Sequence, residues 1–164
     1  VAHAFGGAIA LAYWTEEPRG TRDIDVNVFV APEDCVTVLD RLPAGMTYDE
    51  RTVATITRDG QARVLWDETP IDLFFSYDDL HDEMRLDLRR VPFAEVMIPI
   101  LSPEHLIVCK AVFDRTKDWI DIEQMLVVTE GLDVGTVDRH LVRILGDDHR
   151  SLERFHELSD RFFD

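Results

Sequence analysis

The stretch that decides the fold is Phe5–Val30, FGGAIALAYWTEEPRGTRDIDVNVFV. Its second half, RDIDVNVFV over residues 22–30, alternates polar and apolar side chains, which predicts a half-buried strand. Asp23 and Asp25 stand at the head of that strand, and residues two apart in a strand project from the same face. Two adjacent carboxylates repel each other unless a cation compensates them. Carboxylate oxygens are suitable ligands for Mg²⁺, so the pair predicts a metal site.

A third aspartate occurs in a later apolar run, PIDLFFS over residues 70–76, which predicts another strand. Asp72 lies there between Ile71 and Leu73, and a lone charge among apolar neighbours needs a reason. On a neighbouring strand, Asp72 would complete a three-carboxylate metal site with Asp23 and Asp25. The alternative is that the D-x-D pair only begins a strand at a solvated edge of the sheet.

Gly6 and Gly7 open the first half of the stretch, an apolar run that predicts a short helix over residues 6–14. The turn-rich residues 15–21 end it. A helix N-terminus presents free N–H groups and partial positive charge, and glycines let a phosphate approach the backbone. Next to the aspartates, the doublet therefore predicts a seat for a triphosphate. The alternative for the doublet alone is tight packing of the helix against the sheet.

The chain as far as residue 101 predicts a mixed sheet with helices. Helices are expected over residues 32–42 and in part of residues 77–90, and one or two short strands over residues 91–101. Asp59-Gly60 stands between two β-prone runs, which predicts a hairpin turn there.

From Ser102 onward the pattern becomes helical. Ser102 as N-cap, with Pro103 at the first helical position, predicts one long helix over residues 102–128. Two further helices are expected over residues 134–145 and 148–162.

On a continuous helix, Lys110 would share a polar stripe with other charged residues, namely Asp114, Lys117, Asp118 and Asp121. One alternative is a solvated face with ion pairs between residues four apart. The other is that the stripe contributes to an active site. The expected fold class is α+β, with a mixed-sheet core over residues 1–101 and a helical lobe over residues 102–164 that completes the active site.

Composition limits the possible functions. The 164 residues are 46% hydrophobic, enough for the core of one compact domain or two small lobes. Lys and Arg number 17 and Asp and Glu number 33, so the net charge is −16. That charge disfavours non-specific binding to nucleic acid, and an RNA substrate would need a metal or a local basic patch. It also makes a basic protein partner plausible.

The sequence predicts no membrane association. No apolar run approaches the roughly 20 residues of a membrane span, and the pattern of a signal peptide is absent. Cys35 and Cys109 form neither a disulfide framework nor a metal-ligand spacing. A reducing cytoplasm is the simplest expected location.

The motifs FGG, RGTRDIDV and PIDLFF together resemble the nucleotidyltransferase superfamily typified by DNA polymerase beta. The closer resemblance is to the AbiEii-like nucleotidyltransferases, many of them toxins of type IV toxin–antitoxin systems. RGTRDIDV is similar to their R-x-T-x-D-I-D motif, and SPEHLIVCKAVFDRTKDWIDI is similar to their downstream helix apart from His105. The resemblance spans residues 3–128.

The resemblance implies a nucleotidyltransferase fold and a toxin that works with a cognate antitoxin protein. It implies RNA acceptors, with the 3′ end of tRNA as a candidate. It also implies that Lys110 binds the nucleotide phosphates and that Asp118 takes part in the site.

The expected reaction is Mg²⁺-dependent transfer of a nucleoside monophosphate from a nucleoside triphosphate to an acceptor hydroxyl. Asp23 and Asp25 would hold one or two Mg²⁺ ions on the triphosphate, and Asp72 would assist the second ion and help to activate the acceptor. Gly6-Gly7 and Lys110 would position the phosphates while pyrophosphate leaves.

Three residues before the D-x-D pair are further candidates for nucleotide contact. Arg19 or Arg22 could contact phosphate, although an arginine beside acidic residues also serves as a charge partner. The Thr21 hydroxyl would lie near the triphosphate, so we hypothesise that its modification blocks the site. A mass shift of the intact protein that Thr21→Ala abolishes would support this, and the absence of any shift would remove it.

Two other functions remain open at this point. An acidic pocket would suit a small cationic acceptor, as in nucleotidyltransferases of the aminoglycoside-modifying sort. A non-catalytic binding domain with this fold is the second alternative, although it would not need Asp23, Asp25, Asp72 and Lys110. For RNA, basic patches could come from two groups of arginines, namely Arg85, Arg89 and Arg90, or Arg139, Arg143, Arg150 and Arg154.

Overall fold

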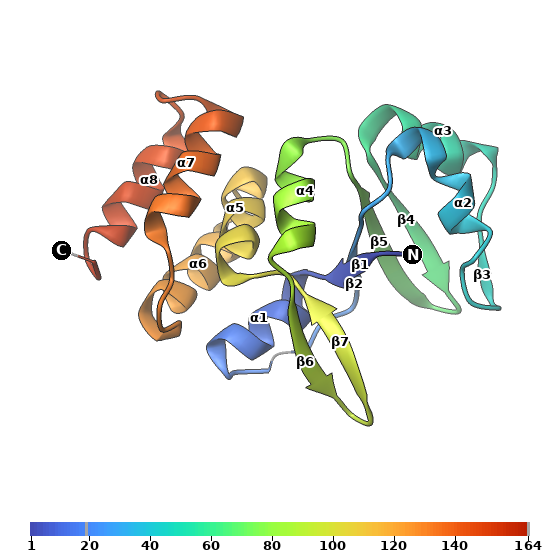
Figure 1. Cartoon of the computed structure of the whole chain (residues 1–164), viewed down its shortest axis with the longest axis horizontal. Helices are drawn as coiled ribbons and strands as arrows, with labels where there is room; N and C mark the ends of the chain where they lie inside the picture. The colour runs from blue at the N-terminus through green and yellow to red at the C-terminus, as the bar shows by residue number, and fades with distance from the viewer. Residues whose placement is uncertain (19, 164) are drawn as a thin grey trace. The chain divides into compact units, whose positions relative to one another are not determined.

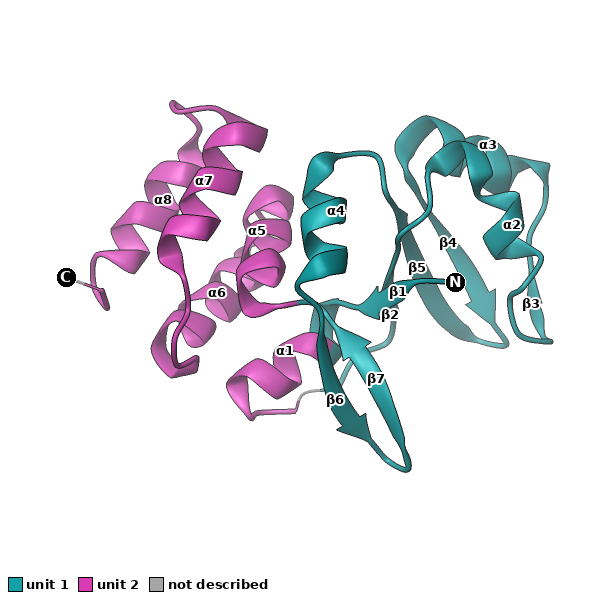
Figure 2. Cartoon of the chain, in the orientation of Figure 1, with its two compact units in different colours: residues 1–9, 19–101 teal, residues 10–18, 102–164 magenta. Residues whose placement is uncertain are grey.

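The computed structural model describes residues 1–18 and 20–163 (Figure 1). The chain divides into two compact units, which Figure 2 colours separately. The first comprises Val1–Ile9 and Arg19–Leu101, and the second comprises Ala10–Pro18 and Ser102–Asp164. The helix α1 (Gly7–Thr15) begins in the first unit and continues into the second.

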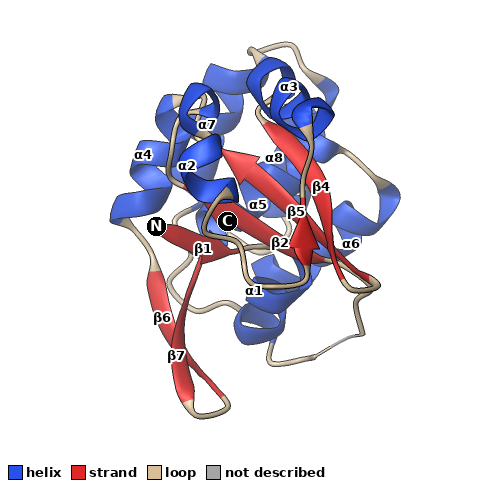
Figure 3. Ribbon diagram, turned by 90° about the vertical axis from the view of Figure 1, so that its right-hand side faces the viewer, coloured by secondary structure: helices blue, strands red, loops and turns tan. Residues whose placement is uncertain are grey.

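The described part of the first unit contains a seven-stranded mixed sheet in the order β3-β4-β5-β2-β1-β7-β6 (Figure 3). The β2–β5 and β1–β7 pairs are parallel, and the other pairs are antiparallel. The mixed sheet and helices of the predicted α+β class are confirmed. The strands are β1 (His3–Phe5), β2 (Ile24–Val28), β3 (Met46–Thr47), β4 (Gln61–Trp66), β5 (Thr69–Phe75), β6 (Arg89–Phe93) and β7 (Val96–Ile100).

The core of the first unit lies on one face of this sheet. The helices α2 (Val36–Leu39) and α3 (Glu50–Asp59) cover that face, and their buried side chains pack on apolar residues of β2, β4 and β5. Because side chains alternate along a strand, the polar residues of β2 and β5 project from the opposite face. Hydrophobic alternation therefore fixes which face carries Asp25 and Asp72.

The predicted hairpin at Asp59-Gly60 is wrong, because these residues end α3. Asp49 caps the start of that helix by accepting the N–H of Thr52 at 2.9 Å, and Gly60 ends it with a left-handed φ of 70°. An Asp-Gly pair serves a helix C-terminus as readily as a hairpin. The hairpin joins β4 to β5 instead, with Asp67 at φ 51° in its two-residue turn.

The remaining elements of the first unit follow the sequence pattern more closely. The helix expected over residues 32–42 is shorter, a 3₁₀ turn η1 (Pro32–Asp34) followed by α2. The partial helix is α4 (Asp79–Leu86), and β6 and β7 form a hairpin over the expected strand region.

The second unit is helical. Its helices after α1 are α5 (Pro103–Phe113), α6 (Thr116–Val128), α7 (Val134–Leu145) and α8 (Arg150–Ser159). Ser102 caps α5 as predicted, since its hydroxyl accepts the N–H of His105.

The single long helix predicted over residues 102–128 is wrong. Asp114 adopts a left-handed φ of 52° and ends α5, and Arg115 is extended before α6 begins. Two local hydrogen bonds stabilise the break. The indole N–H of Trp119 donates to Asp114 at 2.7 Å, and the Arg115 backbone N–H donates to Asp118 at 3.2 Å. Each aspartate therefore gains a partner that a continuous helix would not provide.

Among the described residues, no helix combines the length and the apolar character that crossing a membrane requires.

Candidate functional site

Three charged residues form a row across adjacent strands of the first unit. Arg63 on β4 is the direct Cα partner of Asp72 on β5, and Asp72 is in turn the direct partner of Asp25 on β2. Directly paired residues project from the same face of a sheet. Asp23 precedes Asp25 by two residues at the start of β2. The structure therefore places Asp25 and Asp72 side by side on one face of the sheet, and Arg63 joins Asp72 to Asp23.

The glycine doublet lies against this row. The Gly6 N–H donates to the Asp25 backbone carbonyl at 3.0 Å. Gly7 has a φ of 48°, and a Cβ atom there would lie 1.8 Å from Asp25 Oδ2. Only glycine fits such a position, because it has no Cβ and tolerates positive φ. The doublet therefore places the first turn of α1 directly beside the Asp25 carboxylate.

Arg63 binds Asp72 through both arms of its guanidinium. Nε donates to Oδ1 at 2.7 Å and Nη2 donates to Oδ2 at 2.6 Å, and Nη2 also reaches Asp23 Oδ2 at 3.4 Å. The Asp72 hydrogen bonds, followed by its charge, raise the pKa of Arg63, which stays protonated. The Arg63 side chain is 55% exposed and that of Asp72 is 21% exposed, so solvent and ligands can reach the cluster.

Of the residues before the D-x-D pair, Thr21 contacts this cluster. The Thr21 hydroxyl donates to Asp23 Oδ1 at 2.8 Å, and Thr21 is exposed. Arg22 is also exposed. Arg19 lies outside the described residues.

The donor set fits a hard divalent cation. It consists of carboxylate oxygens from Asp23, Asp25 and Asp72, the ligand type that Mg²⁺ prefers. The cluster also has a cation partner in the structure, because the Arg63 guanidinium bridges Asp72 and Asp23. A metal ion bound there would add positive charge beside the carboxylates.

Lys110 and Asp118 lie in the second unit, inside a buried ion cluster. Lys110 Nζ donates to Asp121 Oδ2 at 2.6 Å and lies 3.7 Å from Asp118 Oδ1. Arg115 donates to Asp118 through Nε at 2.6 Å. Lys110, Asp118 and Asp121 are 5%, 0% and 1% exposed. The solvated-face interpretation of this stripe is therefore wrong for these three residues, because the break at Asp114 lets α6 pack on α5 and close over them.

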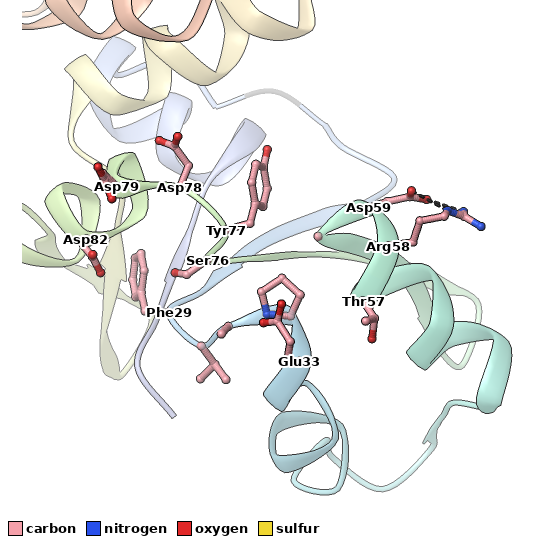
Figure 4. A pocket seen from close by; sticks show the side chains of 14 residues that line it. Phe29, Glu33, Thr57, Arg58, Asp59, Ser76, Tyr77, Asp78, Asp79 and Asp82 are labelled. Atoms are coloured by element: carbon pink, nitrogen blue, oxygen red, sulfur yellow. Dashed lines mark hydrogen bonds and ion pairs between the residues drawn. The ribbon is translucent and has the colours of Figure 1, made fainter.

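A separate open pocket of about 750 Å³ lies beyond the carboxyl ends of β2 and β5 (Figure 4). Its lining includes five acidic side chains and one basic side chain, Arg58, which is paired with Asp59 at 2.5 Å. Phe29 in this pocket is four residues past Asp25, or roughly 13 Å along an extended strand. Asp23, Asp25 and Asp72 do not line this pocket. The cluster of Asp23, Asp25, Asp72 and Arg63, in which opposite charges meet, is therefore the better candidate for the active site.

Sequence reasoning missed Arg63. The signal that could have found it is the two-residue turn at Asp67, which fixes the β4–β5 register and places Arg63 opposite Asp72. Because the hairpin turn was assigned to Asp59-Gly60, the pairing register of β4 with β5 could not be predicted.

Three comparisons with known proteins complement this geometry. Residues 2–164 match the family model described as "Nucleotidyl transferase AbiEii toxin, Type IV TA system". A solved structure, that of an antigenic nucleotidyltransferase-like protein from Paracoccidioides brasiliensis, is similar with a TM-score of 0.48 and 15% identity. The similarity covers 92% of this chain and 84% of that chain. No curated protein matches.

Proposed function

The chain belongs to the AbiEii nucleotidyltransferase family of type IV toxin–antitoxin systems, and we propose that it transfers a nucleoside monophosphate to an RNA hydroxyl in a magnesium-dependent reaction. Family membership makes it a nucleotidyltransferase toxin and implies a nucleoside triphosphate substrate and an antitoxin partner. The observation that carries the metal proposal is the direct pairing of Asp25 with Asp72, with Asp23 linked to Asp72 through Arg63.

In this proposal Asp23, Asp25 and Asp72 hold the metal. Bound there, Mg²⁺ would neutralise charge on the triphosphate and stabilise the attacking and leaving oxygens. The oxygen of the acceptor hydroxyl bonds to the α-phosphorus, and Asp72 accepts the proton that this hydroxyl loses. The bond from that phosphorus to the bridging oxygen breaks, and pyrophosphate leaves with the electron pair.

The chain supplies two further aids to phosphate binding. The Gly6-Gly7 turn brings the N-terminus of α1, the positive end of the helix dipole, beside Asp25. Thr21 and Arg22 immediately precede Asp23 and are exposed. From the family resemblance alone, we add Lys110 as a phosphate ligand and Asp118 as a residue of the site. Lys110 would then exchange Asp121 for phosphate.

The acceptor is the part of the proposal most in tension with the net charge of −16. In the first unit Arg85, Arg89 and Arg90 are exposed and could bind RNA phosphates. In the second unit four arginines are exposed and could also bind RNA phosphates, namely Arg139, Arg143, Arg150 and Arg154. We propose tRNA, through its 3′ end, as the RNA acceptor and the cytoplasm as the location.

The experiment incubates the full chain with α-labelled nucleoside triphosphates, Mg²⁺ and total RNA. Label in RNA from the wild type, absent with Asp25→Asn, supports the proposal. Label only on an added aminoglycoside would instead support a small cationic acceptor, which the acidity of the chain favours. No label on either would leave the proposed reaction without support and favour a binding domain.

A further inference from the structure

The contact between Arg63 and Asp72 occupies both oxygens of a proposed metal ligand. Two parallel N–H···O bonds of 2.7 and 2.6 Å join the guanidinium to Oδ1 and Oδ2. Such forked pairs are among the stronger and more specific polar contacts in proteins. Asp72 therefore cannot turn an oxygen toward a metal without weakening at least one of these bonds.

The same guanidinium also compensates a second carboxylate. Nη2 lies 3.4 Å from Asp23 Oδ2, so one positive charge serves two of the three aspartates. A divalent cation among these aspartates would be repelled by the guanidinium and would compete with it for the same oxygens. Arg63 and the metal are thus alternative partners of Asp72.

Arg63 is placed so that it can exchange partners without unfolding its strand. Its Cα is fixed opposite Asp72 by the β4–β5 ladder, while its side chain is 55% exposed and has room to reorient once its bonds to Asp72 break. A guanidinium released from Asp72 can bind another anion, and phosphate oxygens match its fork. A triphosphate brought to the cluster by the metal provides that anion.

We propose that Arg63 acts as a latch, a side chain that exchanges one anionic partner for another, on the cluster of Asp23, Asp25 and Asp72. It holds Asp72 when the site is empty, and it passes to the triphosphate when metal and nucleotide bind. The latch lowers the affinity for free metal and raises the affinity for the metal–nucleotide pair. This inference rests on the proposed function, because it assumes that Asp72 is a metal ligand.

The test measures Mn²⁺ binding to the full chain by electron paramagnetic resonance, without nucleotide. Arg63→Gln should lower the Kd for Mn²⁺ by roughly fivefold, the upper range for an exposed ion pair. The matched control is Arg58→Gln, because Arg58 forms a similar forked pair with Asp59 at 2.7 and 2.5 Å in the same unit (Figure 4). It removes one positive charge but should leave the Mn²⁺ affinity unchanged. Equal or weaker Mn²⁺ binding by Arg63→Gln would overturn the latch, since a merely structural arginine predicts that result.

A second arm adds a non-hydrolysable nucleoside triphosphate together with Mn²⁺. Here Arg63→Gln should bind the nucleotide more weakly than the wild type, and Arg63→Lys, which keeps the charge without the fork, should lie between them. Nucleotide affinity equal to that of the wild type would overturn the exchange of partners.

Asp72→Asn separates failure of the latch from failure of the proposed function. If Asp72→Asn weakens Mn²⁺ binding while Arg63→Gln does not strengthen it, the metal site stands and the latch is wrong. If Asp72→Asn leaves Mn²⁺ binding unchanged, the proposed metal site fails and the latch fails with it. Thermal unfolding of each variant, expected to stay near that of the wild type, verifies that the fold is intact.

Discussion

Asp25 and Asp72 are direct partners in the parallel ladder between β2 and β5. In that register both carboxylates leave the same face of the sheet, while the alternate residues Val26, Val28, Ile71 and Leu73 face the apolar side. A slip of one residue would turn Asp72 into the apolar core. The packing of the core and the assembly of the acidic cluster are therefore specified by the same pairing.

Replacing one carboxylate of the cluster should abolish transfer without unfolding the protein. For Asp23→Asn, Asp25→Asn and Asp72→Asn we expect kcat to fall by at least about 100-fold, the usual cost of removing a group that stabilises transition-state charge. Stability should change by no more than about 1 kcal/mol, because the ion pairs are partly exposed. Transfer of labelled nucleotide and urea unfolding measure the two effects. The control is Asp67→Asn, an exposed aspartate in the β4–β5 turn, which should keep wild-type activity.

Gly7→Ala should damage the site through both conformation and space. The residue has a left-handed φ of 48°, and the new Cβ would lie 1.8 Å from Asp25 Oδ2. Gly131→Ala is the matched control, because Gly131 has a φ of 72° with no heavy atom within 4 Å of the added Cβ. Gly131→Ala should lower the free energy of unfolding by about 1 kcal/mol, the cost of an alanine at positive φ. Gly7→Ala should lower it by about 1–3 kcal/mol more, because its Cβ also clashes with Asp25. Equal losses in unfolding free energy would show that the Asp25 carboxylate does not lie on Gly7.

Lys110→Ala should destabilise the protein strongly, whatever Lys110 does in catalysis. It leaves the buried Asp121 carboxylate without its 2.6 Å partner, and breaking one side of a buried ion pair costs about 3–5 kcal/mol. Replacing both partners, as in Lys110→Met with Asp121→Leu, should recover most of that stability. Lys117→Ala, at an exposed position, should cost little. Chemical denaturation decides, and a small effect of Lys110→Ala would contradict the buried geometry.

Because of His81, the free energy of unfolding of the protein should fall in mild acid. Burial lowers the pKa of His81 below the ordinary value of 6.5, and the hydrogen bond with the Asp78 carbonyl only partly offsets this. The unfolded chain therefore takes up a proton that the folded chain resists. The His81 contribution is complete above pH 6.5 and is lost as pH falls through the window below it, by at most about 1.4 kcal/mol per pH unit. In urea unfolding, His81→Gln should show a shallower decline than the wild type, and parallel curves would refute the assignment.

The elements that local pattern determines were predictable from the sequence. Alternation gave the strand that carries Asp25, and a serine followed by proline gave the start of α5 at Ser102. Asp59-Gly60 was misread because its dipeptide suits a helix end and a hairpin equally. The break at Asp114 depends on Trp119, a contact that forms only once the chain has turned. Local propensity cannot reveal it.

The site was predictable as a set of residue types and not as a set of contacts. Asp23, Asp25 and Asp72 stand out because charges in apolar strands are costly. Arg63 does not stand out, since an arginine on an exposed strand needs no explanation. Only the pairing register between β4 and β5 shows that it meets Asp72. The burial of Lys110 likewise comes from the packing of α6 on α5, which the pattern of one continuous helix conceals.

The most direct test of the account is the position of bound metal. Crystals of the full chain, grown with Mn²⁺ and a non-hydrolysable nucleoside triphosphate, would give anomalous scattering from the ion. We predict a Mn²⁺ peak bound by oxygens of Asp23, Asp25 and Asp72, with the Arg63 guanidinium withdrawn from Asp72. A peak elsewhere, with the arginine still paired to Asp72, would contradict the account.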